Sequence, residues 1–139
     1  MNIEEHIFFF ILFGLLGITS EVIFISLSKK PKDRTLKGHS SLWMFFIYGM
    51  IYFIVLFGTT YLSMYNFFIR GLVYMILIYI LEFASGFVLK KFRAVPWDYS
   101  KTKKHHFKGL ICPKFAILWF AEGLAAELIY LYIKSHIVF

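Results

Sequence analysis

Apolar residues run along this chain in four long stretches that short polar segments separate. The stretches cover residues 7–27, 42–62, 68–89 and 113–133. An α-helix needs about 20 apolar residues to cross the hydrocarbon core of a bilayer, and each stretch is about that long. The pattern therefore predicts an all-α fold, an integral membrane four-helix bundle. We expect a single transmembrane domain over residues 1–139, with little sequence left for a soluble domain.

The composition supports a membrane protein. Hydrophobic residues make up 60% of the chain and aromatic residues 22%, and the mean hydropathy is +0.71. Soluble domains are only about half apolar. The chain begins with acidic Glu4 and Glu5 where a secretory signal would be basic, so we expect the first apolar stretch to be retained as a helix. The single cysteine, Cys112, cannot form an internal disulfide.

Basic residues predict the orientation in the membrane, because Lys and Arg in short loops stay on the cytoplasmic side. Most of them lie in the first and third connections, namely Lys29, Lys30, Lys32, Arg34 and Lys37, and then Lys90, Lys91, Arg93, Lys101, Lys103, Lys104 and Lys108. The second connection has only Arg70 at its end. We therefore expect both termini to be non-cytoplasmic. The net charge of +7 then reflects topology and contact with anionic lipid headgroups, and nucleic acid is not an expected partner.

Four of the eight acidic residues lie inside the apolar stretches: Glu21, Glu82, Glu122 and Glu127. A charge at the bilayer centre costs on the order of 3 kcal/mol on insertion scales, so such residues usually face the interior of a bundle and mark a site. The alternative is that each glutamate only holds helices together. We favour a site for Glu21 and Glu82 and a structural role for Glu127, and both interpretations stay open for Glu122.

Small residues share helix faces with two of these glutamates. Gly14 and Gly17 fall on the face of Glu21, and Gly71 and Gly86 fall on the face of Glu82. Small residues permit close approach of helix backbones. We therefore expect the first and third helices to pack through these faces, so that the two carboxyl groups meet in one pocket.

The two halves of the chain also resemble each other. Glu21 and Glu82 are followed, at equal spacing, by the pairs Lys29–Lys30 and Lys90–Lys91. A proline and later a Lys-Gly pair follow in each half. This symmetry predicts two parallel helical-hairpin repeats about an axis along the membrane normal. The open alternative is that any two hairpins with basic loops look alike.

The third connection carries the sequence Pro-Trp-Asp-Tyr-Ser at residues 96–100. Trp97 and Tyr99 suit the headgroup level of a bilayer, and Asp98 can cap a segment or pair with a nearby cation. The favoured interpretation is a packed interfacial turn, and the alternative is a cytoplasmic gate or headgroup seat that roofs the site of Glu21 and Glu82.

Other polar residues point less clearly to chemistry. His105, His106 and Cys112 match no standard zinc spacing, and a solvated loop is the favoured interpretation. Ser40 or Ser41 is expected to cap the second helix rather than act as a nucleophile beside His39. We find no Gly-rich phosphate loop and expect neither a metal nor a cofactor.

Three segments carry a resemblance: 38–49, 82–100 and 109–119. They are similar to the CmpB-like family labelled "putative type IV ABC-transporter permease", which includes small uncharacterised four-span animal transmembrane proteins. The resemblance covers most of the chain from Gly14 to Glu127. It implies a four-span fold, with family positions at Glu21, Trp43, Tyr48, Gly49, Glu82, Gly86, Trp97, Asp98, Tyr99, Ser100 and Gly109.

The leading function expected is a small transport or channel-like protein that binds a cation, a proton or a cationic substrate group. The candidate binding residues are Glu21, Glu82, Glu122, Trp43, Tyr48, Trp97, Asp98 and Tyr99. Four helices scarcely enclose a pore, so a homodimer or a partner subunit is expected. Two alternatives stay open. One is an intramembrane enzyme or lipid-headgroup-binding protein with carboxyl groups as acid and base, and the other is a non-catalytic accessory subunit.

Overall fold

The computed structural model describes residues 2–29, 31, 34–101 and 104–137, and in these residues the fold is all-helical. Its long helices are α1 (Ile3–Ser28), α2 (Leu42–Tyr61), α3 (Phe67–Lys91) and α4 (Ala116–His136), with the short helix η1 (Pro113–Phe115) before α4. All four are long and apolar enough to cross a membrane. The predicted four-helix membrane bundle is confirmed. The loop residues Lys30, Lys32, Asp33 and Lys103 lie outside the described part.

Polar side chains set where the helices begin. The Asn2 side chain accepts a hydrogen bond from the Glu5 amide at 2.9 Å, and the Asn66 side chain accepts one from the Ile69 amide at 3.0 Å. Ser41 caps α2 by accepting from the Met44 amide, as one of the two expected capping serines. Because Asn2 caps α1, the helix includes a polar first turn. The apolar pattern that begins at residue 7 does not reveal this turn.

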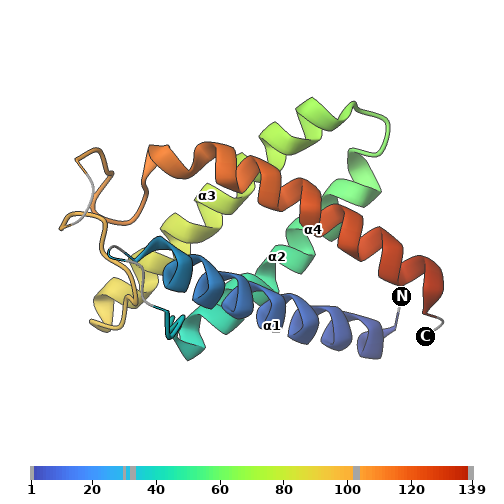
Figure 1. Cartoon of the computed structure of the whole chain (residues 1–139). Coiled ribbons are helices and arrows are strands. Elements are labelled where there is room, and N and C mark those ends of the chain that lie inside the picture. Colours follow the sequence, from blue (N-terminus) through green and yellow to red (C-terminus); the bar gives the residue numbers. More distant parts are fainter. Residues whose placement is uncertain (1, 30, 32–33, 102–103, 138–139) are drawn as a thin grey trace.

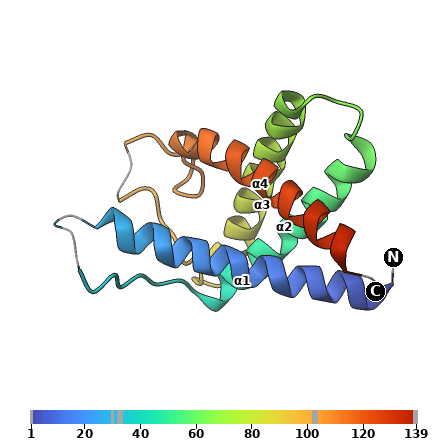
Figure 2. The ribbon, with the colours of Figure 1, turned by 45° about the vertical axis from the view of Figure 1, so that its right-hand side comes forward.

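The helices pack as two pairs, α1 with α2 and α3 with α4. Helix α2 also contacts α3 and α4, so it joins the pairs. Figures 1 and 2 show that the start of α1 and the end of α4 lie together, and that the two helices diverge toward the loops. The pairing agrees with two helical hairpins, while the repeat axis stays a prediction.

The expected packing of α1 against α3 through their glycines is wrong. The backbones at Gly14 and Gly17 lie against Phe45 and Tyr48 of α2, where a Cβ on Gly17 would come within 2.1 Å of Tyr48 Cγ. Gly71 likewise faces Phe120 of α4. The small residues seat aromatic rings of the hairpin partner, and α1 and α3 are not among the extensively packed helix pairs.

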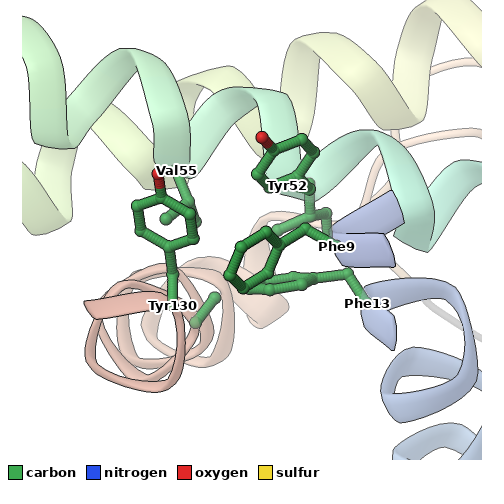
Figure 3. Close-up of a cluster of buried hydrophobic side chains, with 7 residues drawn as sticks. Phe9, Phe13, Tyr52, Val55 and Tyr130 are labelled. Atoms are coloured by element: carbon green, nitrogen blue, oxygen red, sulfur yellow. The ribbon is translucent and has the colours of Figure 1, made fainter. Parts of the chain in front are cut away.

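An aromatic core holds the bundle together where α1 begins and α4 ends (Figure 3). Phe9 and Tyr52 are fully buried and stack with ring centroids 5.3 Å apart, and Tyr130 packs against Phe9 at 4.8 Å. Many large apolar side chains elsewhere are exposed, such as Ile117 and Leu128. Exposed apolar side chains on spanning helices are what a lipid environment accommodates.

Within the described part of the chain, two ion pairs connect α4 to its neighbours, away from the basic first and third connections. Lys134 Nζ lies 3.1 Å from Glu5 Oε1 of α1, and Arg70 Nε of α3 lies 3.3 Å from Glu127 Oε2. Both carboxylates are almost completely buried. Each buried acid here thus has a basic partner on another helix.

Candidate functional site

A partly open cavity of about 540 Å³ lies among the four long helices. It is at the end of the bundle that carries the first and third connections, which we call the loop end. Its walls come from the second half of α1, the first half of α2, the middle of α3 and the first half of α4, with the 96–100 turn and η1 adding residues. Figure 2 shows that α1 and α4 diverge toward this end of the bundle.

Three glutamates line this cavity, and each comes from a different helix: Glu21 from α1, Glu82 from α3 and Glu122 from α4. They lie roughly six to nine residues from the loop-side ends of their helices, which corresponds to about 9 to 14 Å at about 1.5 Å per residue. Glu122 is within electrostatic range of both others. The structure therefore brings the three acids to one space, although α1 and α3 do not pack closely.

Glu82 is the most buried of the three, with 8% of its surface exposed. Tyr99 Oη donates a hydrogen bond to its Oε1 at 2.7 Å. The other oxygen, Oε2, is buried and makes no hydrogen bond within the described part of the chain. The indole N–H of Trp119 lies near this carboxylate but does not reach hydrogen-bond geometry. Glu82 thus presents one oxygen that is held and one that is unpartnered.

Glu21 is held differently. Ser40, in the segment before α2, donates a hydrogen bond from its Oγ to Glu21 Oε2. His39 is within electrostatic range of the same carboxylate. Ser40 therefore ties the first connection to the cavity, a role that its position as a candidate cap did not indicate.

The 96–100 turn covers one side of the cavity through its two aromatic residues, Trp97 and Tyr99. Trp97 Nε1 donates to the Leu110 carbonyl at 3.1 Å, and the Tyr99 amide donates to the Gly109 carbonyl at 2.9 Å. Burial, and after it the charge of Glu82 and the hydrogen bond to it, raises the pKa of Tyr99 well above its usual value. The phenol therefore stays protonated and serves as a donor to Glu82.

Two candidate residues do not line the cavity. Asp98 is exposed and accepts hydrogen bonds from the Ser100 hydroxyl at 2.5 Å and the Ser100 amide at 3.0 Å, which lower the pKa of its carboxyl group. Trp43 is half-exposed and lies beside Phe46 on α2. Because both side chains point elsewhere, the structure separates them from the three acids. Tyr48, in contrast, lines the cavity and is within electrostatic range of all three.

Other lining residues had little or no sequence signal as parts of a site. Phe115 lies in η1 just before α4, and Phe24 lies on the same helix as Glu21. Aromatic residues are so frequent in this chain that composition and spacing do not single these two out. Trp119 lies three residues before Glu122, a spacing that places both on one face of α4.

In the described residues, the three cavity glutamates have neither a Lys or Arg partner nor a metal-binding cluster around them. Within residues 2–29, 31, 34–101 and 104–137, no Lys or Arg lies within ion-pair distance of the three glutamates, and no three His, Cys, Asp or Glu side chains are placed to hold one metal ion. His105 and His106 are exposed in their loop, whereas Cys112 is buried and its carbonyl accepts a hydrogen bond from Tyr79 Oη at 3.0 Å.

Comparison with known families agrees with this architecture. A family model described as "Putative ABC-transporter type IV" matches residues 8–138. The chain belongs to this family. With four helices able to span a bilayer, it is an integral multi-pass membrane protein. No solved structure matches the chain at a significant level.

Proposed function

We propose that this protein binds a cation, or the cationic group of a substrate, in the cavity of Glu21, Glu82 and Glu122, and that it acts in membrane transport. The observation that carries the proposal is the meeting of three acids from three helices in one cavity, with no Lys or Arg paired to them in the described residues. Membership of a family described as transporters supports the transport part.

The physical reason is the cost of unpaired charge in a bilayer. A bundle that needs acids only as links between helices can pair them with bases, as Glu5 and Glu127 are paired. Acids left without a base keep a negative potential that a mobile cation or proton can neutralise. The partly open cavity gives such a cation room and access.

The proposal includes an orientation. The loop end of the bundle carries most of the basic residues, so we place the cavity toward the cytoplasm, both termini on the other side, and the loops against anionic lipid headgroups. Since four helices enclose no complete pore, a second copy or a partner subunit would complete the pathway around this single transmembrane domain.

Cysteine labelling tests the orientation. In a Cys112→Ser background, single cysteines replace exposed Lys37 or exposed Tyr65, at opposite ends of the bundle. An impermeant maleimide should label Tyr65→Cys in intact cells and Lys37→Cys only after the membrane is opened. The reverse pattern would place the cavity on the outer side.

Transport is tested with purified protein in liposomes and three probes: Na⁺, Rb⁺ and methylammonium. Loss of a charged hydrogen-bond partner costs about 1.5 to 3 kcal/mol, so Glu82→Gln should reduce uptake of the transported cation about tenfold or more. The matched control is Glu4→Gln, which removes an exposed carboxylate at the far end of α1. Uptake no faster than in protein-free liposomes, or equal uptake by the two variants, would contradict the proposal.

A further inference from the structure

One wall of the cavity differs in its chemistry from the others. The rings of Tyr99 and Phe115 have centroids 5.6 Å apart, and the rings of Phe115 and Trp119 have centroids 5.9 Å apart. All three residues line the cavity. They therefore form a continuous aromatic wall that runs from the 96–100 turn through η1 into α4.

Glu82 lies at this wall and is held against it. Its Oε1 accepts a hydrogen bond from Tyr99, which is part of the wall, and the Trp119 N–H lies near the same carboxylate. Its Oε2 is buried and has no hydrogen-bond partner in the described residues, and only 8% of the surface of the residue is exposed. A buried carboxylate oxygen without a donor is costly, and a ligand that donates a hydrogen bond would satisfy it.

The size of the cavity and the spacing of its acids argue against a bare inorganic ion as the occupant. A water molecule takes up about 30 Å³ in the liquid, and the cavity holds about 540 Å³, within the range of about 300 to 1,000 Å³ that is usual for organic ligands. The acids, moreover, do not form a group that could hold a metal ion in the described part of the chain.

We propose that Glu82 and the aromatic wall bind the ammonium group of an amphipathic organic cation, whose apolar part fills the rest of the cavity. The inference rests on the proposed function and narrows its cation to an organic ammonium compound. Aromatic faces attract such a cation through their quadrupoles, most strongly when it is desolvated. Glu82 Oε2 accepts its hydrogen bond or neutralises its charge, and the apolar remainder of the lining excludes water from its body.

The test uses calorimetry on the full-length protein in lipid nanodiscs at pH 7 and constant ionic strength. The probes are 2-phenylethylammonium chloride, its neutral counterpart 2-phenylethanol, and NaCl. The two organic probes share one apolar body and differ in the ammonium and hydroxyl groups. We expect saturable binding of 2-phenylethylammonium, with an affinity at least about tenfold above that of 2-phenylethanol because the buried carboxylate pairs with the charge.

Two variants separate the charge from the rings. Glu82→Gln should weaken 2-phenylethylammonium binding about tenfold or more and leave 2-phenylethanol binding unchanged. Phe115→Leu, which keeps apolar volume but removes a ring, should weaken it about fivefold. The matched control Phe57→Leu removes an exposed ring of α2 outside the cavity and should have no effect. If Glu82→Gln fails to fold, the affinities of Phe115→Leu and Phe57→Leu for 2-phenylethylammonium still test the ammonium site.

The outcomes distinguish this inference from the function on which it rests. Equal affinity for the ammonium and the alcohol, or equal effects of Phe115→Leu and Phe57→Leu, would overturn the ammonium site. If Na⁺ binds in a Glu82-dependent manner while 2-phenylethylammonium does not, the ammonium site is wrong and cation binding stands. If 2-phenylethylammonium binds as expected and no cation crosses liposome membranes, the site stands and the transport function is wrong.

Discussion

The two ends of the bundle, one with the chain termini and the other with the first and third connections, differ in how the acids of their helices are paired. At the first, Glu5 pairs with Lys134 and Glu127 pairs with Arg70, and an aromatic core fills the space between helices. At the second, Glu21, Glu82 and Glu122 line a cavity, and no basic residue of the described chain is paired with them.

The contrast separates acids that stabilise the bundle from acids that are available to a ligand. A paired, buried carboxylate has its charge neutralised within the protein, and little is left for a partner from outside. Two of the cavity acids accept hydrogen bonds from neutral donors: Glu21 from the Ser40 hydroxyl and Glu82 from the Tyr99 phenol. A hydroxyl donor fixes the position of a carboxylate without cancelling its charge.

The largest effect on stability is expected when the ion pair of Arg70 and Glu127 is broken. Arg70→Gln leaves Glu127 buried without its cation, so we expect a loss of about 3 kcal/mol in the free energy of unfolding. The double variant Arg70→Met with Glu127→Met should recover most of it, because an apolar pair avoids the cost of burying charge. Denaturant unfolding in mild detergent measures both. Equal stability of Arg70→Gln and the natural protein would break the comparison.

A cavity acid should respond in the opposite direction. Glu82→Gln keeps the shape of the side chain and the acceptor for Tyr99 but removes an unpaired intramembrane charge. We expect the free energy of unfolding to stay unchanged or to rise by on the order of 1 kcal/mol, in the same assay. A loss comparable to that of Arg70→Gln would mean that Glu82 is a structural link like Glu127.

A third variant tests how the turn holds Glu82. Tyr99→Phe removes the phenol that donates to Glu82 and keeps the ring that packs on Phe115. The expected loss is about 1 kcal/mol, the usual net contribution of a hydrogen bond. Phe115→Leu, which keeps the phenol, serves as the control. Unchanged stability in Tyr99→Phe would show that the hydrogen bond from the phenol to Glu82 does not help to hold the turn.

The smallest effect is expected at Asp98, which lies in the same turn but outside the cavity. Hydrogen bonds from Ser100 lower its pKa in the folded state, so its contribution to stability is present above its unfolded pKa of about 4 and is lost as the pH falls through the lower folded value. The melting temperature should therefore change slightly less between pH 3 and pH 7 in Asp98→Asn than in the natural protein. Loss of ligand binding in Asp98→Asn would show that Asp98 contributes to the binding site.

Much of the membrane architecture could be predicted from the sequence alone, because the length and apolar character of a spanning helix are local properties. Its length and apolar composition are set by the bilayer, so the four helices could be located from the apolar stretches alone. Because acids are rare in such helices, Glu21, Glu82 and Glu122 could also be recognised from the sequence as candidate binding residues. These two signals depend on each segment's own sequence and on the solvent around it.

The neighbours of each helix were decided only by tertiary structure. Glycine spacing showed which faces allow close approach but not which helix approaches, and the rings of Phe45, Tyr48 and Phe120 occupied those faces from the hairpin partners. For the same reason, a pattern of acids could not reveal that Glu127 has Arg70 beside it while Glu82 has Tyr99. Pairing depends on side chains distant in sequence meeting in space, and only the packing of the helices determines which of them meet.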